Sequence, residues 1–318
     1  MQPDVRVRFT PALRTQPAPG WEEPACLLCG GQRRKIVVRA YDNAATDDWH
    51  RYTVVECLDC GLRFTSPRPL PDLIGEFYPD GYDPHELPAR RRQRSWRAWL
   101  AGQLGSSRHF RKALPWRGRG RLLDFGCGGG SYLERMHQLG WQVTGIDVSP
   151  IAVDRIRTHL GLRALAGSLP HPELSAGSFD VVTMWHSLEH VHDPLSVLRA
   201  AHRLLAPGGR LLVAAPNIQS LPFLWFGQAW YGLDLPRHLI HFTPQTLIAA
   251  VRAAGFGGID MRMLRHSGWL RKSAQIAPQY QALPAWQRWL RSKLASRLIT
   301  AYCAVVHQTD CMLLTAER

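Results

Sequence analysis

Short apolar segments alternate with amphipathic ones over the last two thirds of the chain. Leu122–Phe125 and Phe179–Met184 have the composition of strands buried on both faces, and Ser131–Gly140 has apolar residues at helical spacing before a closing glycine. Leu204–Val213 and Asp310–Ala316 each contain another apolar strand-like run. Alternation of this kind predicts an α/β fold with a doubly wound, largely parallel sheet.

The last third of the chain adds further elements. Thr243 and Pro244 are the N-cap and first residue of a predicted helix, and Gly255–Leu264 is predicted to be the sixth strand of the sheet. About 44 residues then precede the final strand; they are helical and amphipathic in pattern, and rich in tryptophan and basic residues. They are compatible with a hydrophobic acceptor pocket, a homodimer interface or simple padding of the sheet.

A glycine-rich turn follows the first strand of the α/β region. Gly126, Gly128 and Gly130 permit unusual backbone angles and let a ligand approach main-chain atoms. Asp147 lies 21 residues after Gly126, where an acidic side chain in such a unit accepts hydrogen bonds from ribose hydroxyls. In a dinucleotide dehydrogenase the third glycine would stand at Ser131, so the spacing argues against NAD and for another nucleoside.

Four cysteines form two Cys-x-x-Cys pairs, each followed by glycine. Cys26 and Cys29 make the first pair, and Cys57 and Cys60 make the second after 27 intervening residues. Each pair can present two thiolates from one tight turn, and four thiolates complete a closed tetrahedral shell around structural Zn²⁺. Two disulfides or a redox couple are the alternatives, but no signal peptide and no surrounding βαβ pattern supports them. The sequence therefore predicts a zinc ribbon.

The cysteine pairs and the glycine turn divide the chain into four parts. We expect a loose leader at 1–20, a zinc ribbon at 21–66 with strands at 35–39 and 52–56, linker or lid helices at 67–118, and the main domain at 119–318.

The segment between ribbon and main domain has two notable stretches. Tyr78 and Tyr82 lie in a turn-rich aromatic stretch that could fold over a ligand as a lid, or serve as a plain surface linker. Arg90–Trp99 is basic and helical in pattern, which suits contact with phosphate or a membrane surface, although a solvated helix face has the same pattern.

Composition and charge limit the function further. A chain of 318 residues with 45% hydrophobic and 20% charged residues is typical of a globular protein of about two domains. The formal charge of +14 favours an anionic partner, although a genome rich in arginine codons would produce the same excess. Neither a run of 18 apolar residues nor a secretory signal is present, so we expect a cytoplasmic protein without a transmembrane segment.

Further motifs occur in the same strand and helix order: Gly177–His186, Leu188–Val191 and Leu204–Val213. With the glycine turn and Asp147, they resemble the class I S-adenosylmethionine-dependent methyltransferases from about Leu122 onward. The resemblance implies a Rossmann-like sheet of seven strands and S-adenosyl-L-methionine as cofactor. Its implied cofactor-binding residues are Asp124, Gly126, Cys127, Gly128 and Gly130 for the methionine part, Asp147 and Val148 at the ribose, Ser168 and Leu169 at the adenine, and Trp185 at the edge of the active site.

The end of the strand Phe179–Met184 should lie near the transferable methyl group, because ligands bind at the carboxyl ends of parallel strands. There His186, Glu189 and His190 form His-x-x-Glu-His, a spacing that would place the three side chains on one helix face. Zinc peptidases share this spacing, but the fold context argues against them. It also resembles the Glu-x-x-Glu-His segment of ubiquinone-pathway O-methyltransferases, which is associated with a divalent cation.

Because His186 replaces the first glutamate of that segment, we expect it to act as a general base, with Glu189 and His190 as orienters or packing residues. Farther on, Leu233–Pro244 resembles the loop that closes the substrate pocket in small-molecule methyltransferases, which makes His238 and His241 further catalytic candidates. Asp234 and Arg237 are expected to pair and fix this loop.

We therefore expect methyl transfer from S-adenosylmethionine to an oxygen, or less readily a carbon or nitrogen, of a small molecule such as a lipid, quinone or glycan precursor. The alternatives are an RNA methyltransferase, suggested by the ribbon and the charge, and a non-catalytic binding module that retains the cofactor fold. The absence of an Asn/Asp-Pro-Pro-Tyr-like tetrad argues against a nucleic-acid acceptor.

Overall fold

The computed structural model describes residues 19–43, 50–78, 120–280 and 282–318. Seven strands form its main sheet in the order β12, β13, β10, β9, β6, β7, β8, and β13 alone is antiparallel to both of its neighbours. This confirms the predicted seven-stranded α/β fold. The strand bounds are β6 Arg121–Phe125, β7 Gln142–Asp147, β8 Arg163–Ala166, β9 Phe179–Trp185, β10 Leu205–Pro216, β12 Gly257–Leu264 and β13 Cys311–Glu317.

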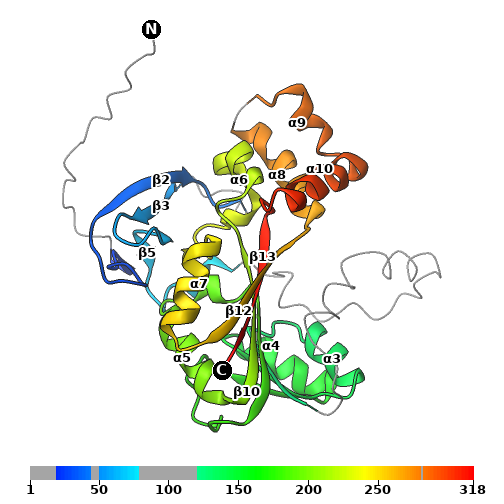
Figure 1. The fold of residues 1–318 in the computed structure, drawn as a ribbon. Coiled ribbons are helices and arrows are strands. Elements are labelled where there is room, and N and C mark those ends of the chain that lie inside the picture. Colours follow the sequence, from blue (N-terminus) through cyan, green and yellow to red (C-terminus); the bar gives the residue numbers. More distant parts are fainter. Residues whose placement is uncertain (1–18, 44–49, 79–119, 281) are drawn as a thin grey trace.

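Helices cover both faces of this sheet, as Figure 1 shows. Successive strand residues point to opposite faces: Leu123 packs with Val197 and Leu247 on one side, whereas Leu122 packs with Leu133 and Val153 on the other. Thr243 caps its helix as predicted, accepting a hydrogen bond from the Thr246 backbone N–H. The helices are α3 Ser131–Gln138, α4 Pro150–Arg155, α5 Pro194–Leu204, α6 Leu221–Phe226, α7 Pro244–Ala253, α8 Ser267–Ile276, α9 Ala285–Trp289 and α10 Lys293–Val305.

The order of strands changes direction at β6. The chain passes from β6 to β7 and β8 on one side, then returns to place β9 on the other side of β6. In open α/β sheets the crevice at such a switch point, beyond the carboxyl ends of the strands, is where ligands bind. The glycine turn after β6, Asp147 at the end of β7 and His186 after β9 all lie at this edge.

The cysteine-containing segment forms a second sheet with the order β11, β4, β3, β2. The predicted strands are confirmed as β2 Arg34–Ala40 and β3 Tyr52–Cys57, followed by β4 Arg63–Thr65, whereas β11 Ile240–His241 comes from the main domain. Phe64 and Leu62 of the ribbon share one hydrophobic core with Leu239 and Met184. The ribbon and the main domain therefore share both a sheet and a core.

The long C-terminal interval is helical, as predicted. α8 and α10 pack on each other, and Figure 1 shows them with α9 at one end of the molecule. Leu270 and Ala274 of α8 belong to a core that includes Tyr52 and Val54 of the ribbon. α8 therefore packs on the ribbon. The outer side of α10 exposes four apolar side chains, at Leu294, Leu298, Tyr302 and Val305.

Some sequence predictions cannot be compared with the structure. The leader up to residue 18, Tyr82 and the basic segment Arg90–Trp99 lie outside the described residues. Within the described ranges, no helix is long and apolar enough to cross a membrane.

Candidate active site

The glycine turn after β6 is held against the segment that follows β9. Gly126 has a φ of 71°, and a Cβ there would come within 2.4 Å of the Ser187 Cβ. The Ser187 hydroxyl donates a hydrogen bond of 2.8 Å to the Phe125 carbonyl, which fixes this close approach. Only glycine combines the left-handed backbone with the absent side chain. The turn is thus a preformed main-chain cradle of the kind that holds a nucleoside ligand.

Asp147 closes the side of this cradle. One carboxylate oxygen accepts a hydrogen bond of 2.8 Å from the Gly128 N–H, and the other accepts one of 2.9 Å from the Ser149 N–H. Each carboxylate oxygen has two lone pairs, so both can still accept from a ribose hydroxyl. The residues present therefore fit S-adenosylmethionine, with Asp147 at the ribose and the turn at its methionine part.

Asp124 lies beneath the turn on β6. Its side chain is 2% exposed and accepts a hydrogen bond of 2.7 Å from the Thr183 hydroxyl. Burial and the nearby charge of Asp147 together raise the pKa of Asp124 to about 7, despite the lowering effect of the Thr183 hydrogen bond. A cationic amino group nearby would favour the charged form, so Asp124 suits the ammonium of the cofactor's methionine part.

The other predicted cofactor residues differ in position. Val148 follows Asp147 with 69% of its surface exposed, so its side chain is accessible to a ligand. Trp185 ends β9 and meets the Tyr132 ring edge-on at 5.3 Å between centroids. Leu169 and Cys127, by contrast, point into the hydrophobic cores. For these two residues, a cofactor contact would have to come through the backbone, as it also can at Gly130 and Ser168.

The His-x-x-Glu-His segment is not one helix. His186 has a φ of 52° directly after β9, and only Leu188–His190 form a short 3₁₀ turn. The helical prediction was wrong, but the tight turn still brings His186 Nδ1 to 3.4 Å from Glu189 Oε1. Burial would lower the pKa of His186, but Cys311 and Glu189 outweigh it and raise this pKa to about 10.

Glu189 is the centre of a buried cluster. Its side chain is fully buried, and neither carboxylate oxygen has a hydrogen-bond partner among the described residues. Its Oε1 lies 4.0 Å from His238 Nε2. Burial alone would raise the pKa of Glu189, but the neighbouring His186 and His238 lower this pKa. Glu189, His190 and His238 place their donor atoms within 4.8 Å of one another, a set that can also hold a divalent cation.

The two other histidines of this cluster have defined ring orientations. His238 Nδ1 lies 3.0 Å from the Gly232 carbonyl, and His190 Nδ1 lies 3.0 Å from the Arg237 carbonyl. A carbonyl only accepts, so each Nδ1 carries a proton, and in the neutral ring Nε2 is the nitrogen with the free lone pair. Burial lowers the pKa of His190 to about 4. The Tyr78 hydroxyl, from the predicted lid segment, lies 3.1 Å from His190 Nδ1.

The loop that carries His238 is anchored by a buried ion pair. Arg237 contacts Asp234, as predicted, and also binds both carboxylate oxygens of Asp42 at 2.8 and 2.6 Å. His241 is 2% exposed, and its Nε2 bonds to the Thr65 hydroxyl at 3.1 Å. Burial lowers the pKa of His241 well below its usual range. These contacts place His241 in the packing between loop and ribbon, and its catalytic role stays a prediction.

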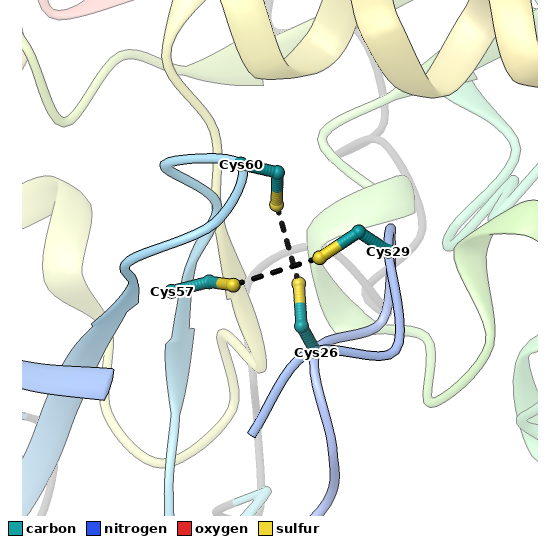
Figure 2. A group of neighbouring side chains, drawn as sticks. All are labelled: Cys26, Cys29, Cys57 and Cys60. Carbon is teal, nitrogen blue, oxygen red and sulfur yellow. Dashed lines mark hydrogen bonds between the residues drawn. The ribbon is translucent and has the colours of Figure 1, made fainter. Parts of the chain in front are cut away.

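The four cysteines of the ribbon converge as predicted. Figure 2 shows their side chains pointing toward one another, with Sγ separations of 3.4 Å between Cys26 and Cys60 and 3.6 Å between Cys29 and Cys57. Sulfurs around tetrahedral zinc stand about 3.8 Å apart for Zn–S bonds of about 2.3 Å, whereas disulfide sulfurs are bonded at about 2.05 Å. All four sulfurs lie within 4.8 Å of one another, so this donor set fits a closed zinc site.

The knuckle turns also present amides to the sulfurs. Gly30 and Gly61 have φ values of 75° and 77°, as the glycine after each pair predicted. Backbone N–H groups at positions 59 and 60 offset the effect of burial and lower the pKa of Cys57. Such hydrogen bonds stabilise thiolates, the form in which cysteine binds metal.

Comparison with known proteins identifies the domain that this sheet and cradle form. Residues 89–260, more than half of the chain, match the family described as methyltransferase domain. The chain belongs to the class I S-adenosylmethionine-dependent methyltransferases. The described part of the matched region contains the glycine turn, Asp147 and the Glu189 cluster.

Several curated relatives of this methyltransferase share one name. The ubiquinone biosynthesis O-methyltransferase of Xanthomonas euvesicatoria is 35% identical over 165 residues, which cover 48% of this chain and 69% of the relative. The protein of the same name from Bordetella avium is 37% identical over 159 residues, 46% of this chain and 66% of the relative. The matches therefore leave about half of this chain outside them.

Solved structures show a similar fold. Phosphoethanolamine N-methyltransferase 2 of Haemonchus contortus, in complex with S-adenosyl-L-methionine, matches with a TM-score of 0.50 and 15% identity over 90% of this chain and 68% of that one. An S-adenosylmethionine-dependent methyltransferase from Mesorhizobium loti matches with a TM-score of 0.48 and 20% identity over 66% of this chain and 96% of that one.

Sequence reasoning missed several residues of the methyltransferase site. Asp42 was not singled out, although it binds Arg237 from 195 positions away. His266 and Cys311 were not singled out either, yet both lie beside His186. The residue types alone were visible in the sequence; their convergence depends on loops that carry no local signal.

Proposed function

We propose that this methyltransferase transfers a methyl group from S-adenosylmethionine to an oxygen of a small molecule, of the class of hydroxylated quinone precursors. The names of the relatives at 35% and 37% identity support this choice of acceptor. The observation that carries the proposal is the buried Glu189 with its two histidines, directly beyond the strand end where the acceptor of a class I enzyme must lie.

O-methylation requires an aligned oxygen and a group that takes its proton. The bound cofactor supplies a methyl group on a sulfonium, and the acceptor oxygen forms the new C–O bond as the C–S bond breaks and its electron pair stays on sulfur. Trp185 and the turn around Ser187 wall this position at the end of β9, which helps to exclude water.

We assign proton acceptance to His238. Its Nδ1 is engaged by the Gly232 carbonyl, so Nε2 is the basic atom. Nε2 faces Glu189 Oε1 at 4.0 Å and Asp234 Oδ2 at 3.7 Å, two carboxylates that would stabilise the imidazolium after proton transfer. His186, the base expected from sequence, has Nε2 at 3.7 Å from Cys311 Sγ and Nδ1 at 3.4 Å from Glu189 Oε1, so its two nitrogens face these side chains.

The experiment is a turnover assay with S-adenosylmethionine and a panel of phenolic and catecholic acceptors. His238→Asn keeps a donor for the Gly232 carbonyl but lacks a proton acceptor, so we expect turnover to fall about 10²- to 10⁴-fold with cofactor affinity unchanged. The exposed His159→Asn is the matched control. Equal turnover in both variants would remove His238 from the mechanism, and turnover only with amine acceptors would overturn O-methylation.

We also infer that Cys26, Cys29, Cys57 and Cys60 hold one structural Zn²⁺. The support is the tetrahedral spacing of the four sulfurs and the amides aimed at Cys57. With four protein ligands no position remains for substrate, so this metal would act on stability alone.

A further inference from the structure

A second cluster with metal-binding side chains lies beside the active site. His186 follows β9, His266 immediately precedes α8, and Cys311 begins β13. One ligand atom from each lies within 4.8 Å of the other two. Three elements far apart in sequence therefore bring two imidazoles and one thiol together at the carboxyl end of β9.

The spacing matches a metal site. Cys311 Sγ lies 3.7 Å from His186 Nε2. Across a tetrahedral zinc ion, a sulfur at about 2.3 Å and a nitrogen at about 2.0–2.1 Å from the metal stand about 3.6 Å apart. Two imidazoles and a thiolate are ligands that Zn²⁺ and its neighbours in the transition series bind well.

Glu189 orients the central histidine of this cluster. Its Oε1 lies 3.4 Å from His186 Nδ1, on the side of the ring away from Cys311. A carboxylate at Nδ1 keeps a proton on that nitrogen, so a metal that binds this ring would take the place of the proton on Nε2. Glu189 is fully buried, so its charge acts on His186 with little screening by water.

The surroundings keep the cluster in place and partly open. Cys311 is fully buried, whereas the His186 side chain is 30% exposed. The Trp269 ring stands 5.1 Å from His186 and 5.3 Å from His266 between centroids, which limits how the two imidazoles can turn. Ligands held on one side and accessible on the other are typical of sites that retain an exchangeable position.

We propose that His186, His266 and Cys311 bind a divalent transition-metal ion, Zn²⁺ by preference, with an open fourth position directed at the acceptor. Only the role of this ion in catalysis rests on the proposed function. An acceptor hydroxyl bound at the open position would lose its proton more readily, and His238 would take that proton. Metal binding itself requires no turnover and can be measured alone. The ion differs from that of the ribbon in its three ligands and its open position.

The test is a Co²⁺ titration of the full chain after one equivalent of Zn²⁺ has filled the ribbon. Zn²⁺ binds such ligands more tightly than Co²⁺, so the ribbon is not displaced. We expect one further equivalent of Co²⁺ with a thiolate-to-metal charge-transfer band in the near ultraviolet. Cys311→Ser should abolish this band, His266→Ala should weaken it, and Cys303→Ser, which changes a buried cysteine outside the cluster, should preserve it.

Two results would overturn the proposal. One is a wild-type titration without a second equivalent; the other is Co²⁺ uptake without the charge-transfer band, which would assign the ion to Glu189, His190 and His238, where no thiolate is available. Parallel calorimetry with S-adenosylmethionine tests the proposed function separately. If the wild-type protein does not bind S-adenosylmethionine, methyl transfer is contradicted, whereas the Co²⁺ titration still decides the metal site.

Discussion

Removal of Asp42 tests whether the ribbon helps to hold the active-site loop. Asp42 is 6% exposed, and its two oxygens accept hydrogen bonds of 2.8 and 2.6 Å from Arg237, whose side chain is fully buried. Charged hydrogen bonds contribute about 1.5–3 kcal/mol each, and removing one partner of a buried ion pair costs about 3–5 kcal/mol. Arg237 retains Asp234 and the Phe77 carbonyl, so we expect Asp42→Ala to cost about 3 kcal/mol.

The assay is urea unfolding followed by tryptophan fluorescence, with the free energy of unfolding obtained from the midpoint and slope. The control is Asp260→Ala, which removes a pair with Arg262 at 2.7 Å in which both side chains are 53% exposed. Exposed pairs contribute less than about 1 kcal/mol. Equal stability of the two variants would refute the buried anchor.

The same Asp42→Ala variant separates the loop from the cofactor cradle. Because Asp147 is held by the Gly128 and Ser149 N–H groups, whereas Asp42 holds Arg237 on the His238 loop, we expect S-adenosylmethionine affinity to change less than about twofold while turnover falls at least tenfold. A parallel loss of affinity would show that the anchor also shapes the cradle.

Three further variants test the remaining assignments. Asp147→Ala removes a charged acceptor for two ribose hydroxyls, and each lost hydrogen bond costs about 1.5–3 kcal/mol. Calorimetry should therefore show S-adenosylmethionine binding at least about 100-fold weaker. Normal binding would show that the cofactor does not bind beside Asp147. The pKa of Asp124 is raised to about 7, and we expect its carboxylate form to pair with the ammonium of the cofactor. The affinity for S-adenosylmethionine should therefore rise as pH increases through about 7 and then level off. Asp124→Asn should give an affinity that does not change with pH in this range. Cys26→Ser should lose one equivalent of zinc by elemental analysis and lower the urea midpoint, and unchanged metal content would contradict the ribbon.

The sequence predicted the parts of the molecule that local chemistry determines. Apolar runs identified β6 and β9, and the glycines marked the turn because left-handed backbone and close approach to Ser187 exclude other residues there. The cysteine pairs were equally readable, since ligand spacing within a knuckle is local. In each case a few neighbouring residues carry the whole signal.

The contacts that assemble the active site were not predictable in this way. β11 is only two residues long, yet its pairing with β4 places Thr65 beside His241 and the loop of His238. The His-x-x-Glu-His spacing suggested a helix, but the left-handed His186 ends the strand and turns its ring toward Cys311. Such contacts depend on long-range packing that no window of sequence contains.

The shared sheet would give the ribbon a role in the proposed reaction that a closed, structural metal site lacks. The Thr65 hydroxyl donates a 2.8 Å hydrogen bond to the His238 carbonyl, and Asp42 holds the neighbouring Arg237. Both contacts fix the backbone on which the proposed proton acceptor stands. Because a displacement of about 1 Å at a reacting group can cost about 10²-fold in rate, loss of the ribbon metal should reduce turnover through the position of His238, before the main sheet unfolds.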